Sequence, residues 1–86
     1  NVQNSAIQLA HKKSLEMAIV SLEDISVELR DITSITMAID PAKIPEAKAR
    51  IRDFRRSLCE FLESGKRSEV FQLNIQMIPI TKRKKT

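Results

Sequence analysis

The sequence of 86 residues has no Trp and no Tyr, and it contains one Gly, one Cys and one His. One Cys excludes a disulfide framework, and one His with one Cys excludes a structural zinc site. A single Gly excludes a glycine-rich phosphate loop. The missing Tyr and Trp argue against an RNA-reading sheet, because such sheets stack bases on aromatic rings. We therefore expect neither a metal site nor a cofactor.

Groups that perform catalysis are equally scarce. Nucleophilic catalysis needs Ser or Cys beside a base, and the sole His, His11, lies in the middle of an expected helix with Lys12 and Lys13 after it. Cys59 follows Leu58, so we expect a buried or boundary thiol rather than a reactive one. The sequence thus predicts no enzymatic activity, and no catalytic residue is assigned.

The distribution of apolar residues bears on the compartment. The longest apolar run covers residues 17–20, far short of the ~20 residues that a membrane span needs. Residues 1–20 also lack the compact apolar core of a signal peptide, and a lone Cys fits a reducing cytosol. We expect a cytoplasmic chain without membrane contact. Its first residue is Asn rather than Met, which favours a fragment or a processed product.

The positive charge is unevenly distributed. The chain has 15 basic and 11 acidic residues, a formal net charge of +4, and four of the basic residues stand at 82–85. Without them the balance is 15 − 4 = 11 basic against 11 acidic residues. The sequence therefore predicts one charge-balanced domain over residues 1–81 and a flexible basic tail over residues 82–86.

Two segments predict helices. Residues 3–23 contain no Gly or Pro and are apolar on more than one side, which indicates burial by more than one neighbour. The second helix opens at Asp40, an expected cap, and starts at either Pro41 or Pro45. It ends at Ser64-Gly65. Its apolar stripe has spacings of three and four and consists of Ile44, Ala47, Ile51, Phe54, Leu58 and Phe61.

Residues 31–39 and 70–78 alternate apolar and polar side chains, which is typical of strands, and residues 24–30 read as a connection. The predicted fold class is α+β, a helix-strand-helix-strand sandwich of ferredoxin-like character. Because two strands alone make a poor sheet, we expect a homodimer to complete it. The candidate dimer-interface residues are Leu15, Ile19, Leu22, Ile75 and Met77.

Two further surfaces suggest binding. Basic residues on the second helix, with the tail, could hold nucleic acid through phosphate contacts; the candidates are Arg52, Arg56, Lys82, Arg83, Lys84 and Lys85. Against this, acidic residues stand at salt-bridging spacings, which favours a solvated helix face; the expected pairs are Glu46–Arg50, Asp53–Arg56 and Arg56–Glu60. The uncharged face of the last strand is a candidate ligand or partner site, formed by Gln72, Asn74 and Gln76.

Three segments together carry a family resemblance. Residues 30–39 (RDITSITMAI), 44–56 (IPEAKARIRDFRR) and 70–81 (VFQLNIQMIPIT) resemble, in this order, the C-terminal domain of a family of uncharacterised bacterial proteins. That family is a conserved hypothetical group with a domain of unknown function, viewed as transcription-regulator-like because helix-turn-helix or winged-helix sequence precedes this region.

The resemblance implies that a DNA-binding module stands outside this chain, and it supplies no catalytic or ligand residue. We expect a dimerisation or regulatory domain of a bacterial transcriptional regulator, which meets DNA through the upstream module. The alternatives are direct nucleic-acid binding through the basic helix and tail, and a sensor domain that binds a small ligand or protein on the polar face.

Overall fold

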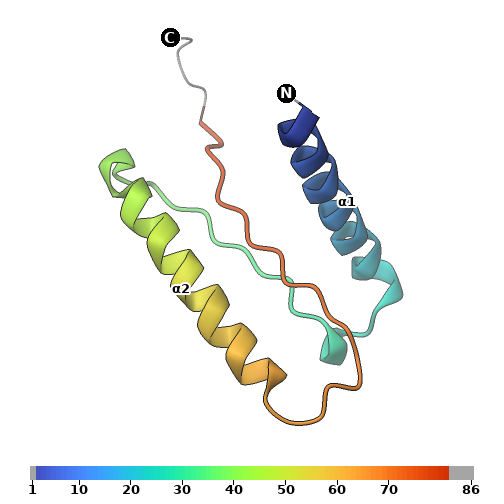
Figure 1. The fold of residues 1–86 in the computed structure, drawn as a ribbon. Helices are drawn as coiled ribbons and strands as arrows, with labels where there is room; N and C mark the ends of the chain where they lie inside the picture. The colour runs from blue at the N-terminus through green and yellow to red at the C-terminus, as the bar shows by residue number, and fades with distance from the viewer. Residues whose placement is uncertain (1, 82–86) are drawn as a thin grey trace.

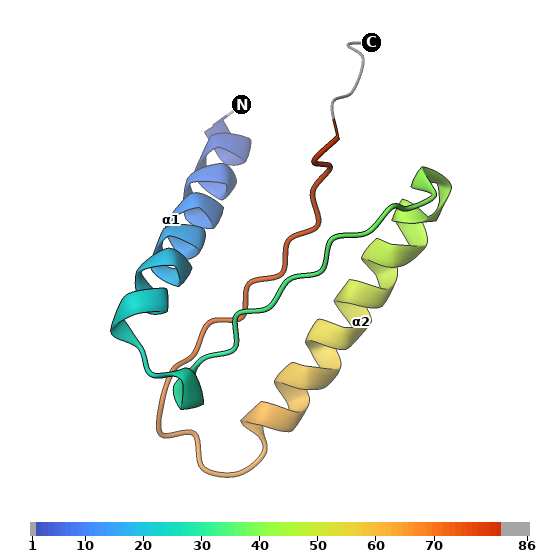
Figure 2. The same ribbon diagram turned by 180° about the vertical axis from the view of Figure 1, so that it is seen from behind.

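The computed structural model describes residues 2–81. Two long helices, α1 (Val2–Asp24) and α2 (Ile44–Glu63), account for most of the regular structure, and two short 3-10 helices, η1 (Val27–Leu29) and η2 (Pro41–Lys43), precede α2. Extended segments over residues 31–40 and 66–81 lie between the two long helices in both views (Figures 1 and 2). The predicted helix over residues 3–23 is confirmed, within one residue at each end.

The side chain of Arg30, the residue after η1, makes hydrogen bonds at the C-terminal end of α1. Arg30 donates from Nε to the carbonyl oxygen of Ile25 at 2.9 Å and from Nη2 to that of Leu22 at 3.5 Å. The last carbonyl groups of a helix lack partners within the helix, and a cation is favoured at the negative end of the helix dipole. Arg30 therefore fixes the direction in which the chain leaves α1.

Pro41 and Pro45, the two alternative starts that the sequence left open, both contribute to the start of α2. Asp40 Oδ1 accepts a hydrogen bond from the backbone N–H of Ala42 at 3.0 Å, as a capping carboxylate does. Pro41 begins the turn η2, which leads directly into α2 at Ile44, and Pro45 is the second residue of α2. Both prolines are tolerated because the first N–H groups of a helix have no intrahelical acceptor.

The predicted end of α2 is confirmed. The helix ends at Glu63, and Ser64 donates from Oγ to the carbonyl oxygen of Phe61 at 2.6 Å. Gly65 has a φ of +100°, a backbone conformation that side chains with a Cβ rarely adopt. Gly65 thus turns the chain back toward the second extended segment.

The predicted α+β sandwich of ferredoxin-like character is wrong. Among residues 2–81 there is no β-strand, and no backbone hydrogen bond joins the two extended segments. The alternation of side chains at 31–39 and 70–78 goes with an extended backbone, but a strand also needs a hydrogen-bonded neighbour. The two segments run in the same direction between the long helices (Figures 1 and 2) but form no such ladder. The sheet that dimerisation was expected to complete is therefore absent from the described residues.

The chain encloses no core. No residue is buried among those whose side chains the structure describes, and the radius of gyration is 15.9 Å, against about 12 Å expected for a compact chain of this length. Half-buried apolar positions follow one side of α2, at Ile44, Ala47, Ile51 and Leu58. Phe54 and Phe61, which were expected in the same stripe, are mostly exposed.

Candidate functional site

One polar junction ties α1 to the second extended segment. Gln72 donates from Nε2 to Ser14 Oγ at 3.0 Å, and Asn74 donates from Nδ2 to the carbonyl oxygen of Ser14 at 3.4 Å. Ser14, Ala18 and Ser21 recur at helical spacing and are half-buried, so the side of α1 that meets this segment carries small side chains. Two of the three amides proposed as a ligand face, Gln72 and Asn74, are therefore engaged within the chain.

Neither Ser14 nor Arg30 is among the candidate site residues that the sequence predicts. A signal for Ser14 exists in the spacing of Ser14, Ala18 and Ser21, since small side chains on one helix face permit close approach of another segment. Arg30 carries no comparable signal, because its hydrogen bonds depend on the turn η1 folding the chain back to the end of α1.

The α1 candidates for a dimer interface are exposed. Leu15, Ile19 and Leu22 have exposed fractions of 40%, 64% and 50%. Each lies about one turn from the next along α1, beside the side that carries Ser14 and Ala18. Large apolar side chains in this arrangement form a continuous ridge on one helix.

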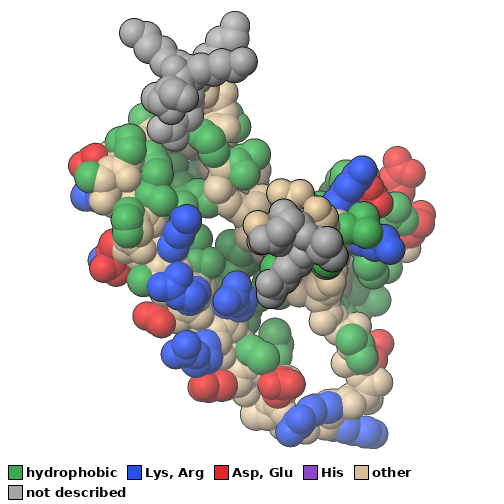
Figure 3. Space-filling model, turned by 45° about the horizontal axis from the view of Figure 1, so that its top comes forward, with side chains coloured by type: hydrophobic (Ala, Val, Ile, Leu, Met, Phe, Trp, Pro, Cys, Tyr) green, Lys and Arg blue, Asp and Glu red, His purple; other side chains and the backbone are tan. Residues whose placement is uncertain are grey.

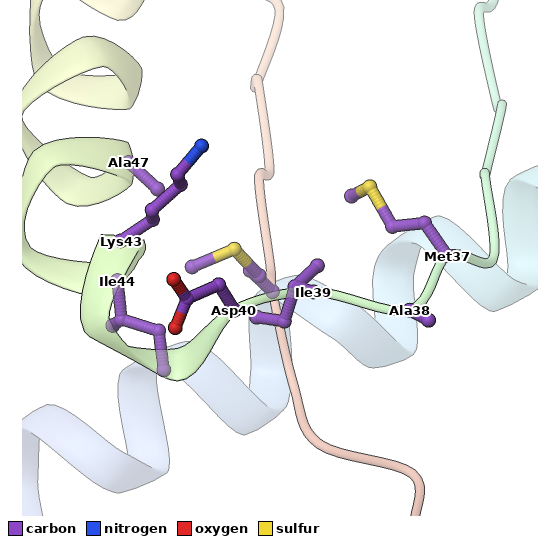
Figure 4. Close-up of a pocket in the computed structure, with 8 residues that line it drawn as sticks. Met37, Ala38, Ile39, Asp40, Lys43, Ile44 and Ala47 are labelled. Atoms are coloured by element: carbon purple, nitrogen blue, oxygen red, sulfur yellow. The ribbon is translucent and has the colours of Figure 1, made fainter.

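The other two interface candidates lie on the second extended segment. Ile75 and Met77 are exposed to 40% and 38%. Met77 also lines an open hollow of about 350 Å³ at the start of α2, together with Met37, Ala38, Ile39, Asp40, Lys43, Ile44 and Ala47. In Figure 4, Met37 and Ile39 come from the first extended segment, whereas Ile44 and Ala47 come from α2. The hollow is mainly apolar, and its one carboxylate, on Asp40, caps η2.

Basic side chains gather along α2, on the face seen in Figure 3. Arg52, Arg55 and Arg56 line an open cleft of about 430 Å³, together with Cys59 and Glu60. The sequence-predicted candidates Arg52 and Arg56 are thus brought together, and Arg55 joins them. The other nucleic-acid candidates, Lys82, Arg83, Lys84 and Lys85, lie outside the described residues.

Of the three ion pairs expected on α2, one forms. Arg50 Nε lies 3.2 Å from Glu46 Oε2, and both side chains are largely exposed. The expected pairs Asp53–Arg56 and Arg56–Glu60 do not form within 4.0 Å in the described part of the chain. Arg56 therefore keeps its charge free for another partner.

Cys59 is exposed, so the expectation of a buried or boundary thiol is wrong. Its Sγ–H donates a hydrogen bond to Glu63 Oε1 at 3.3 Å. This hydrogen bond, the negative charge of Glu63 and, to a smaller extent, Glu60 raise the pKa of the thiol. A raised pKa lowers the fraction of thiolate, the nucleophilic form, so this cysteine is not activated.

Between residues 2 and 81, no three His, Cys, Asp or Glu side chains come together in a way that could hold a metal ion. His11 is exposed on α1. In the same part of the chain, no helix combines the length and the apolar character that crossing a membrane requires.

These features define a small two-helix domain that presents apolar and cationic surfaces. The chain belongs to the family described as "Domain of unknown function (DUF4423)", whose model matches residues 1–80. No curated protein and no solved structure matches the chain. The expected resemblance to a family with a domain of unknown function is thereby confirmed at that level.

Proposed function

We propose that this chain is a C-terminal dimerisation or regulatory domain of a bacterial cytoplasmic transcriptional regulator, whose DNA-binding module lies outside the chain. Two copies would associate through their exposed apolar surfaces. Their upstream modules would then sit at a fixed spacing, as dimeric proteins that read two half-sites require.

The large exposed surface area is the observation that supports association with a second copy of the chain. The chain exposes 8878 Å², whereas a compact monomer of 9.8 kDa exposes about 5,200 Å². The excess of about 3,700 Å² is ample for the share that each chain contributes to an obligate dimer, roughly 1,000–2,500 Å². Small domains often gain stability by burying such area against a partner, and none of the side chains that the structure describes is buried within one copy.

The ridge of Leu15, Ile19 and Leu22 on α1 is the proposed centre of the contact. Burying one large aliphatic side chain stabilises an assembly by about 1.5–3 kcal/mol, so three of them supply a substantial part of a dimer's free energy. Ile75 and Met77 extend the apolar surface on the second extended segment. This contact needs no strand pairing between copies.

The regulator assignment draws on the resemblance of residues 30–39, 44–56 and 70–81 to a transcription-regulator-like group. It is tested by the coding sequence that precedes Asn1, which should encode a helix-turn-helix or winged-helix module. A precursor without such a module would contradict the regulator assignment. It would not affect the proposal that two copies of this chain associate.

The alternative of a sensor on the polar face has weaker support. Gln72 and Asn74 already bond to Ser14, so a ligand there would have to displace α1 or use Gln76 alone. Ligand screening by thermal shift tests it, because a compound that binds the folded form raises the melting temperature.

Sedimentation of residues 1–86 tests the dimer directly. The expected mass is twice 9.8 kDa, and Leu22→Asp should return it to one chain, because a carboxylate in the apolar contact loses its hydration. The control is Lys13→Asp, which places the same side chain at an exposed polar position of α1. It should leave the dimer intact.

Two outcomes contradict the proposal. A wild-type chain that stays monomeric at high concentration would show that something other than a second copy covers the apolar surface. A Leu22→Asp variant with an unchanged dimer mass would remove the α1 ridge from the interface. Circular dichroism of both variants checks that the helices persist.

A further inference from the structure

The cleft on α2 is lined by three guanidinium groups and one carboxylate. Arg52, Arg55 and Arg56 provide the positive charges, and Glu60 the negative one. The three arginines stand within about two turns of the helix, so their side chains leave α2 on neighbouring levels of the same side. The cleft is open to solvent, and an extended ligand can reach all three.

None of these three arginines forms an ion pair in the described part of the chain. In residues 2–81 the only ion pair joins Arg50 to Glu46, and no side-chain hydrogen bond involves the guanidinium groups of Arg52, Arg55 or Arg56. The carboxylate of Glu63, a nearby acidic residue, accepts a hydrogen bond from the thiol of Cys59. Once residues 82–85 are set aside, the domain has 11 basic and 11 acidic residues, with these three arginines among the 11 basic ones. The positive charge of the cleft is therefore a local feature of a domain without net charge.

The chemistry of the cleft favours phosphate. Guanidinium groups bind phosphate oxygens through two parallel hydrogen bonds, and they remain charged at every physiological pH. No aromatic ring and no amide side chain lines the cleft. A groove for single-stranded nucleic acid stacks bases on aromatic rings, and reading base edges needs side chains placed in a groove of the duplex. The cleft has no aromatic ring for stacking, and its exposed guanidinium groups suit the repeating phosphates of a duplex backbone.

We propose that the cleft formed by Arg52, Arg55 and Arg56 binds the phosphate backbone of double-stranded DNA without reading its sequence. The choice of DNA rests on the proposed function, because a module in the same polypeptide would bring a duplex close to this domain. Phosphate contacts position a protein on the duplex and strengthen binding at low salt.

The test uses the full chain of 86 residues and a short labelled DNA duplex, with binding followed by fluorescence anisotropy. To remove the contribution of the tail, Lys82, Arg83, Lys84 and Lys85 are all replaced by Gln. Three contacted phosphates give a slope of log affinity against log salt near −2.7, a loss of roughly 40-fold between about 50 and about 200 mM salt.

Charge reversal in the cleft should weaken this binding. Arg52→Glu and Arg56→Glu should each reduce the affinity several-fold and flatten the salt dependence by about one phosphate contact. Arg50→Glu is the matched control, since it reverses a charge on the same helix outside the cleft, where Glu46 already neutralises it. It should leave the affinity nearly unchanged. Circular dichroism confirms that each variant stays helical.

Several results overturn the proposal. These are no binding at low salt, loss of all binding in the tail-neutral chain, or equal weakening by Arg50→Glu and Arg52→Glu. Equal affinity for duplex RNA, or competition by inorganic phosphate at concentrations comparable with the DNA phosphates, would reject DNA as the ligand. Sedimentation distinguishes this proposal from the proposed dimer. A dimer that does not bind DNA contradicts only the DNA-binding role of the cleft, and a monomer that binds DNA contradicts only the dimer.

Discussion

Gln72 donates a hydrogen bond to Ser14 although 58 positions separate the two residues, and the bond between Nε2 and Oγ measures 3.0 Å. Asn74 adds a second bond to the backbone of Ser14 at 3.4 Å. Because none of the side chains described in the structure is buried, apolar burial within one copy contributes little to holding α1 in place. The Ser14 junction therefore has a disproportionate part in fixing α1 against the second extended segment.

Disrupting this junction should loosen α1. Gln72→Ala and Ser14→Ala should each lower the free energy of unfolding by about 0.5–1 kcal/mol, the range for an exposed hydrogen bond. The double variant should lose less than the sum, because both changes remove the same bond. Urea unfolding at one fixed protein concentration measures this, since association shifts the midpoint.

Gln76→Ala is the matched control for Gln72→Ala. Gln76 follows on the same alternating side of the segment but has no hydrogen bond in the described structure. Its removal should change the free energy of unfolding little. Strictly additive effects of Ser14→Ala and Gln72→Ala would show that the two side chains do not interact in solution.

Loss of the cap at Asp40 should destabilise the start of α2. Asp40→Ala removes the acceptor for the N–H of Ala42 and should cost about 1 kcal/mol. Asp40→Asn keeps a side-chain oxygen at the same place and should cost much less. Thermal unfolding followed by circular dichroism compares the two. Asp31→Ala, which removes a carboxylate from the extended segment, should be nearly neutral, and an equal loss in both Ala variants would contradict the capping role.

The ends of α2 were predictable because the signals are local. Asp40 accepts a hydrogen bond from the N–H two residues away, and Pro41 has no N–H of its own that would lack a partner in the first turn. Gly65 supplies a backbone conformation that its own lack of a Cβ permits. Whether residues 31–39 and 70–78 form strands could not be predicted from local signals in this way. Alternation at residues 70–78 is compatible with any extended backbone, whereas a strand depends on hydrogen bonds to a segment far away in the sequence.

The candidate site likewise has features that local spacing predicts and features that it does not. The spacing of Arg52 and Arg56 correctly placed them on one side of α2, since helix geometry fixes which residues are neighbours. Whether Arg56 pairs with Glu60 depends on how both side chains turn, which spacing does not determine. The burial of Cys59 was inferred from Leu58, yet consecutive residues point about 100° apart around a helix. One faces the inner side of α2 and the other faces solvent.

The hydrogen bond from Cys59 to Glu63 predicts a measurable pH dependence. Glu63 raises the pKa of the thiol, first by accepting its proton in a hydrogen bond and then by the repulsion between its carboxylate and a thiolate; Glu60 adds a smaller repulsion. Alkylation by iodoacetamide proceeds through the thiolate, so its rate should rise at a higher pH in this protein than in a short cysteine peptide. Because Cys59 is exposed, the reagent has access and the rate reports the ionisation.

Removing the carboxylate should reverse this shift. Glu63→Gln keeps an oxygen that can accept the S–H bond but removes the charge, so the pKa should fall and the rate profile should move to lower pH. Glu60→Gln, the control on the same helix, should move the profile less, because Glu60 contributes the smallest of the causes. Identical profiles for the wild-type chain and Glu63→Gln would show that the two side chains do not meet in solution. A larger shift with Glu60→Gln would show that Glu60, and not Glu63, is the carboxylate that acts most strongly on the thiol.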